Sequence, residues 1–117
     1  MSNPAHLLYN VVIFVPVTHA DIIREALSDA KGGTMEDGYD SCTFSCRGLT
    51  RFRPLHGANP AIGTIGSVEI VEEERIEVTV LPKYLTQVLT AVTSKHPYEK
   101  PCILVQEVKN YVNYLNG

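Results

Sequence analysis

Residues 38–80 read GYDSCTFSCRGLTRFRPLHGANPAIGTIGSVEIVEEERIEVTV, and this stretch decides how the rest of the chain is arranged. Its start alternates apolar and hydroxyl residues, which predicts a half-buried strand over 39–46. Apolar residues of one parity at its end predict one long strand, or two collinear strands, over 67–81. Residues 48–66 carry prolines and glycines without a sustained period, which predicts a functional or interface loop with a short strand at 50–53.

The long strand carries two acidic residues on its apolar face. Glu72 and Glu74 have the same parity as Ile76, Val78 and Val80. A carboxylate is not left unpaired in a hydrophobic core, because its desolvation costs too much free energy. The strand is therefore expected either to bulge at this point or to extend past the helices that cover it.

The first third of the chain supplies one strand and one helix. Residues 7–15 are apolar at the odd positions and at most even ones, which predicts a strand buried on both faces. Helical periodicity predicts a helix over 19–31, and Thr18 with Asp21 has the spacing of a capping box. Gly32-Gly33 is expected to end the helix in the left-handed conformation.

The last third supplies a second helix and a final strand. The helix is expected from Pro82 to about Lys95, the strand over 102–108, and a short helix in the tail 109–117. The order β-α-β-β-α-β predicts an α+β, ferredoxin-like sandwich, an antiparallel sheet with two helices on one face. Because the first strand is apolar on both sides, a second copy of the chain is expected to cover the open face.

The composition indicates one globular domain over 1–117, with its core at 7–108. The chain has 117 residues, of which 44% are hydrophobic and 20% charged, and a net charge of −3. This charge gives no general attraction to nucleic acid or to an anionic membrane. No segment has the length of a membrane helix, no signal or transit peptide is legible, and three cysteines fit no disulfide framework, so the cytoplasm is expected.

Three groups of side chains are candidates for chemistry. Cys42 and Cys46 lie about 13 Å apart on one face of a strand, too far to share a metal ion, and are expected to be buried structural thiols. Basic residues at 47–56 precede acidic residues at 69–77, which either pair with one another or hold a ligand. His96 is expected to cap the second helix as a cation, or to form a small ligand or metal site together with Tyr98 and Glu99.

A set of short motifs in this order resembles the Nif-three-like dimetal-binding proteins, also called the GTP cyclohydrolase I type 2 family. The resemblance runs from Tyr9 to about Val108 and rests on these residues: Cys42-Thr43-Phe44, Phe52-Arg53-Pro54, Gly57, Asn59-Pro60, Ile62-Gly63, Gly66, Val71 to Glu77, and His96-Pro97-Tyr98-Glu99. It implies the insertion domain of that family as a free-standing chain, with a fold like that of the CutA and PII-like proteins and assembly into trimers through the long strands. The family's two metal ions are bound by flanking halves that have no counterpart here, and Lys100 and Cys102 depart from the family's pattern.

We therefore expect a non-catalytic, oligomeric CutA/PII-like domain that binds a small ligand or a divalent metal ion. The expected ligand-binding residues are His96, Tyr98, Glu99, Arg53 and Glu77, with His96 and Glu99 as ligands of the metal. No cofactor is required, a trimer is favoured over a dimer, and neither nucleic acid nor membrane is an expected partner. Two alternatives stay open: a metal-assisted hydrolase that uses the His96–Glu99 corner, and a purely structural interaction module.

Overall fold

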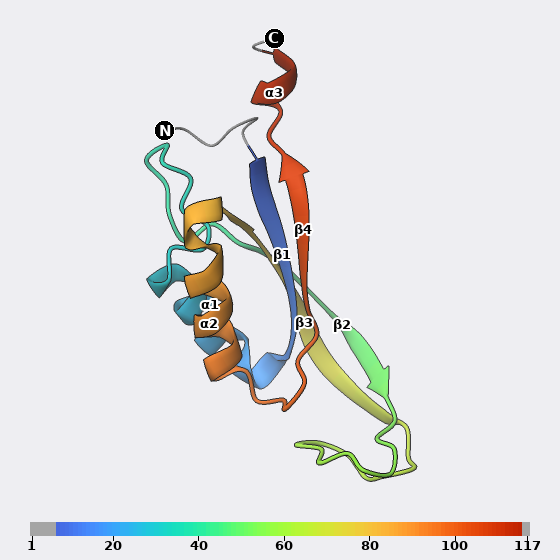
Figure 1. The fold of residues 1–117 in the computed structure, drawn as a ribbon. Coiled ribbons are helices and arrows are strands. Elements are labelled where there is room, and N and C mark those ends of the chain that lie inside the picture. Colours follow the sequence, from blue (N-terminus) through green and yellow to red (C-terminus); the bar gives the residue numbers. More distant parts are fainter. Residues whose placement is uncertain (1–6, 116–117) are drawn as a thin grey trace.

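The computed structural model describes residues 7–115, which form one four-stranded antiparallel sheet with two helices on one of its faces (Figure 1). The spatial order of the strands is β2-β3-β1-β4, as in a ferredoxin-like fold. The predicted fold class is thus confirmed. The elements in chain order are β1 (Leu7–Pro16), α1 (Ala20–Asp29), β2 (Phe44–Phe52), β3 (Glu69–Val80), α2 (Leu85–Lys95), β4 (Ile103–Lys109) and α3 (Val112–Leu115).

The core lies between the sheet and the helices. On β1 the side chains of Val11, Ile13 and Val15 are fully buried, and they pack with buried residues of β3, α1 and α2. Val12 on the opposite face of β1 is 1% exposed, so this central strand is buried on both faces, as its sequence predicts. In the described part of the chain, no helix is long and apolar enough to cross a membrane.

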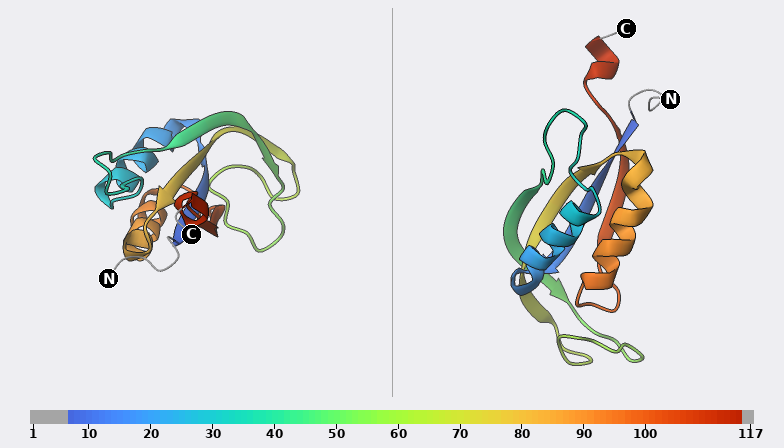
Figure 2. Two further views of the ribbon diagram at one scale, coloured as in Figure 1. Left: turned by 90° about the horizontal axis from the view of Figure 1, so that it is seen from above. Right: turned by 90° about the vertical axis from the view of Figure 1, so that its left-hand side faces the viewer.

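The hairpin of β2 and β3 continues past the ends of the helices (Figure 2). The pairing of the two strands is continuous from Phe44 opposite Glu77 to Phe52 opposite Glu69, without a bulge. Of the two predicted solutions for the acidic residues of β3, the extension applies to Glu72, which is exposed, whereas Glu74 stays buried beneath the helices and is paired with Arg24. Ile70 is 55% exposed at the far end of this hairpin, beyond the helix layer.

Two predictions about the segment before β3 were wrong. The second strand begins at Phe44 rather than Tyr39 and runs without a break to Phe52, so the loop that follows covers only 53–68. Where the hairpin extends past the helices, neither face of β2 is buried, and the sequence shows no alternation there. Cys42 and Cys46 are exposed free thiols rather than buried ones.

The ends of α1 also differ from the prediction. No side chain caps its N-terminus, and the Asp21 carboxylate instead accepts a hydrogen bond of 2.7 Å from Arg24. At the C-terminus the left-handed residue is Lys31 (φ 75°) rather than a glycine. The amide of Gly32 donates to the Leu27 carbonyl (2.8 Å) and that of Lys31 to the Ser28 carbonyl (3.1 Å), the pattern of a Schellman motif.

One glycine has a strict steric role. Gly33 has a positive φ of 76°, and a Cβ at this position would lie 2.4 Å from the carbonyl oxygen of Cys42. Its amide also donates to the Thr79 carbonyl of β3 (2.9 Å). Gly33 therefore joins the end of α1 to the segment before β2 at a distance that no other residue permits.

Candidate functional site

A pocket of about 490 Å³ lies against the face of the sheet that the helices leave open. Its floor includes Phe14, Phe52 and Glu73, which share this face because they alternate with helix-facing residues along their strands. The segment 53–62 supplies one wall and the segment 98–102 the other. Figure 2 shows the loop between β2 and β3 on the opposite side of the molecule from the helices. We call this cavity the Tyr98 pocket.

The hydrogen bond between Tyr98 and Glu73 lies at the inner end of this pocket. The Tyr98 hydroxyl donates to Oε2 of Glu73 over 2.7 Å, and the Glu73 side chain is almost completely buried, at 4% exposure. Burial and the bond to this carboxylate raise the pKa of Tyr98 well above its ordinary value. The ring of Phe52 contacts that of Tyr98 edge to face, with centroids 6.2 Å apart. Tyr98 is thus fixed on both its polar and its apolar side.

A second polar contact joins the two walls. The carboxylate of Glu99 accepts a hydrogen bond of 3.1 Å from the backbone amide of Asn59. These residues are 40 positions apart, so the contact connects the loop after β2 to the loop after α2. Arg53 and Lys100 also line the pocket and are exposed. The predicted site residues Arg53, Tyr98 and Glu99 are therefore brought together.

His96 supports this corner as a neutral imidazole. Its Nε2 lies 2.7 Å from the Phe14 carbonyl oxygen, and its Nδ1 accepts a hydrogen bond of 3.2 Å from the Tyr98 amide. Nε2 therefore carries the proton that it donates to Phe14. Burial lowers the pKa of His96, and this outweighs the opposing effects of the Phe14 bond and the Glu73 charge. The prediction of a cationic helix cap was wrong, because the ring contacts β1 instead of the free carbonyls of α2.

Glu77 lies apart from this pocket. Its carboxylate accepts a hydrogen bond of 3.2 Å from the Asn10 amide and lies 3.4 Å from Nε of Arg75. Together with Cys42 and Phe44 it lines a separate, shallower depression. Of the predicted ligand-binding residues, Glu77 is therefore not brought together with Arg53, Tyr98 and Glu99.

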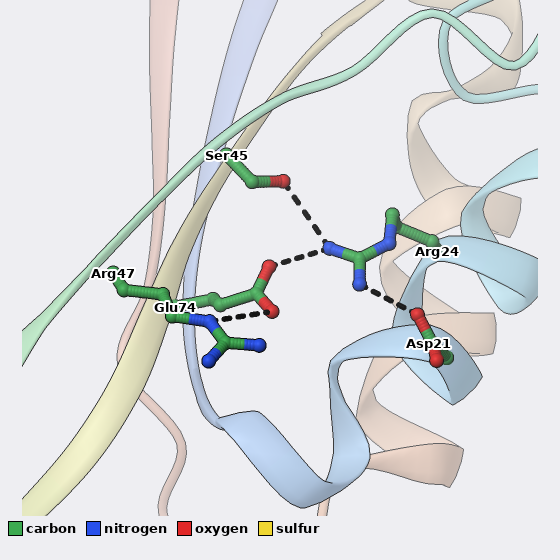
Figure 3. Close-up of polar contacts among 5 residues, drawn as sticks. All are labelled: Asp21, Arg24, Ser45, Arg47 and Glu74. Atoms are coloured by element: carbon green, nitrogen blue, oxygen red, sulfur yellow. Dashed lines mark hydrogen bonds and ion pairs between the residues drawn. The ribbon is translucent and has the colours of Figure 1, made fainter.

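The buried Glu74 is neutralised on the helix side of the sheet (Figure 3). Its Oε1 lies 2.6 Å from Nη1 of Arg24, which also donates to Ser45 (3.2 Å), while its Oε2 lies 3.9 Å from Nε of Arg47. The second guanidinium nitrogen of Arg24 binds Asp21 (2.7 Å). The sequence left two interpretations of the charged segments open, ion pairing and ligand binding. For Glu74 and Arg47 the structure shows ion pairing within the chain.

The geometry offers no ready metal centre among residues 7–115. No three His, Cys, Asp or Glu side chains come together there in a way that would hold a metal ion. Both ring nitrogens of His96 are occupied by hydrogen bonds, and Glu99 already binds Asn59. The metal-binding role of His96 and Glu99 stays a prediction that would require these bonds to rearrange.

Comparison with known proteins gives the family of this chain. No protein-family model matches it. A GTP cyclohydrolase 1 type 2 homologue from Halalkalibacterium halodurans is 45% identical over 94 residues, which are 80% of this chain and 25% of that protein. The crystal structure of a Bacillus cereus protein related to NIF3 matches 90% of this chain and 26% of its own, with a TM-score of 0.77 and 38% identity. The chain is a homologue of one segment of the NIF3-related proteins.

This NIF3-related chain spans about a quarter of the length of the curated relatives that it matches. The periplasmic divalent cation tolerance protein CutA from Archaeoglobus fulgidus has the same fold, with a TM-score of 0.63 over 88% of this chain and 85% of that one. At 18% identity this likeness concerns the fold alone. The predicted resemblance to the family and to the CutA fold is thus confirmed.

Sequence reasoning missed the floor of the pocket. Phe14 reads as an ordinary member of a buried strand, and Glu73 reads as one of several glutamates on β3. The parity of Glu73 does separate it from Glu72 and Glu74, and it places Glu73 on the face that the helices leave open. Its burial follows from the loop 96–102, whose path no local pattern predicts.

The pKa of His96 predicts a pH dependence of stability. A histidine whose pKa is lowered by folding contributes stability that is complete above its unfolded pKa of about 6.5 and is lost as pH falls below that value. The variant His96→Asn keeps a donor and an acceptor but does not titrate. The free energy of unfolding, measured in urea between pH 7.5 and 5, should fall more steeply for the natural protein than for the variant. Parallel curves would show that His96 is not held neutral.

Proposed function

We propose that this NIF3-related chain is an oligomeric domain that binds a small molecule in the Tyr98 pocket and has no catalysis of its own. One observation carries the proposal: a pocket of ligand size whose walls come from separate parts of the chain and are joined by the Glu99–Asn59 contact. A volume of about 490 Å³ falls within the range of known ligand sites. The aromatic rings of Phe14, Phe52 and Tyr98 supply the apolar surface from which most of the affinity of such sites arises.

Assembly with further copies of the chain is supported by exposed apolar side chains on the sheet. Phe44 of β2 is 63% exposed and Leu104 of β4 is 51% exposed, and both lie in the row across the open face that contains the buried Val12. Leu49 and Ile70 are similarly exposed on the extended hairpin. An isolated two-stranded hairpin is only marginally stable in water, so a partner that covers it contributes to its stability.

The overall dimensions also support assembly. The radius of gyration is 16.3 Å, against about 13 Å for a compact domain of this length. The extended hairpin contributes to this excess, since it projects beyond the helices (Figure 1). A trimer is the favoured state.

We also propose a cytoplasmic location, because the three exposed free thiols fit its reducing conditions.

A fragment screen tests the ligand-binding part of the proposal. In two-dimensional NMR spectra of the labelled protein, small aromatic fragments at millimolar concentration should shift the signals of residues around the Tyr98 pocket. The variant Phe52→Ala should weaken the affinity of the best fragment about tenfold, because it removes one of the aromatic rings that line the pocket. Tyr39→Ala, which removes an aromatic ring that is 72% exposed and lies outside this pocket, is the control and should leave the affinity unchanged. A folded protein that binds no fragment at these residues would contradict the proposal.

Sedimentation velocity tests the assembly. At micromolar concentration the natural protein should sediment as a trimer, and Leu104→Asp should shift it towards the monomer because a carboxylate is costly to bury in an interface. The control Ile22→Asp places the same charge on a 46% exposed position of α1, on the helix side of the sheet, and should leave the assembly intact. A monomeric natural protein would refute this part of the proposal.

A further inference from the structure

The Tyr98 pocket contains a buried carboxylate, Glu73, that forms no ion pair within 4 Å in the described part of the chain. Glu73 is 4% exposed, and its one side-chain hydrogen bond comes from the uncharged hydroxyl of Tyr98. The ion pairs within 4 Å among residues 7–115 involve Glu36, Glu74, Glu77 and Asp21, but not Glu73. A carboxylate taken out of water without a positive partner costs free energy, which a bound cation recovers.

The neighbouring acid on β3 provides an internal comparison. Glu74 is buried to nearly the same extent, at 6% exposure, and the fold supplies it with Arg24 at 2.6 Å and Arg47 at 3.9 Å. Both residues lie on the same strand but on opposite faces of the sheet. On the helix face the chain provides the counter-charge, whereas on the pocket face it provides an open cavity.

The surroundings of Glu73 favour an organic cation over a metal ion. The pocket offers Phe14, Phe52 and Tyr98 as aromatic surface, which favours a cation with an apolar body. The rings of Phe52 and Tyr98 are the ones available for cation–π contact, because the Arg75 guanidinium already lies 5.8 Å from the centroid of the Phe14 ring. A divalent metal ion requires several oxygen or nitrogen donors, and no three acidic, histidine or cysteine side chains meet within the described residues. An amine or amidinium group can instead donate a charge-assisted hydrogen bond to one carboxylate.

We propose that the Tyr98 pocket binds a small organic cation, an amine or amidine on an apolar body, with Glu73 as its counter-ion. This inference rests on the proposed ligand-binding function and specifies its chemistry. The cationic group lies against Glu73 at the inner end, and the apolar body lies between the rings. The exposed side chains of Arg51, Arg53 and Lys100 line the rest of the pocket. If their positive charge outweighed the Glu73 carboxylate, the pocket would bind an anion in preference to a cation.

A matched series of probes distinguishes these cases. Benzamidine, benzamide and benzoate share one ring and differ in the charge of its substituent. Affinities measured by NMR titration at pH 7 should place benzamidine about tenfold or more above benzamide, with benzoate weakest. In Glu73→Gln, which keeps the shape and can still accept the Tyr98 bond, this preference should shrink to about threefold or less. The control Glu69→Gln, on the same strand and face but outside the pocket lining, should keep the full preference.

The possible failures are separable. If benzoate binds tightest, or if the three probes bind equally, the pocket is a ligand site but the inference of a cationic ligand is overturned. If Mg²⁺ or Mn²⁺ displaces benzamidine at equal concentration, the site is a metal site and the inference also fails. If none of the probes or fragments binds the folded protein, the proposed function fails with it. Tyr98→Phe retains the carboxylate and should retain the preference for benzamidine.

Discussion

The hydrogen bond from the Tyr98 hydroxyl to the Glu73 carboxylate is the contact on which the shape of the pocket on the open face of the sheet depends. It attaches the loop after α2 to the middle of β3, and the His96 ring, bound to Phe14 on β1, holds the same loop from the other side. These contacts bury Glu73 and form the inner end of the Tyr98 pocket. The open face of the sheet thereby acquires a cavity with a fixed polar group at its base.

The buried glutamates on the two faces of β3 have different polar partners. Consecutive glutamates alternate across the sheet, so Glu74 points towards the helices and Glu73 away from them. On the helix side Arg24 of α1 provides a counter-charge within the chain. On the open side Glu73 accepts a hydrogen bond from the Tyr98 hydroxyl and forms no ion pair within 4 Å among the described residues. This asymmetry, rather than the number of charges, is the reason for proposing a binding site at Glu73 and a structural ion pair at Glu74.

Most of the fold is predictable from the sequence because its strands and helices bury apolar residues at regular spacing. The strand at residues 7–15 and the helix ending near Lys95 follow from periodicity. The cost of burying acids predicts the exposure of Glu72 but not the burial of Glu74, because its partner Arg24 is 50 residues away in the sequence. The path of β2 does not, because its second half is exposed on both faces and carries no alternation. The lining of the pocket is predictable in part: the sequence points to Tyr98, Glu99 and Arg53. The burial of Glu73 depends on a loop residue, Tyr98, that lies 25 residues away in the sequence.

A double-mutant cycle measures directly whether Tyr98 and the carboxylate of Glu73 act as one unit. The free energies of unfolding of the natural protein, Tyr98→Phe, Glu73→Met and the double variant are compared at pH 7 in urea, with methionine at position 73 because glutamine would still accept the Tyr98 hydrogen bond. A hydrogen bond to a buried carboxylate predicts a coupling of about 1–3 kcal/mol between the two sites. Additive effects, with a coupling below about 0.5 kcal/mol, would show that the bond does not organise the pocket and would contradict the account.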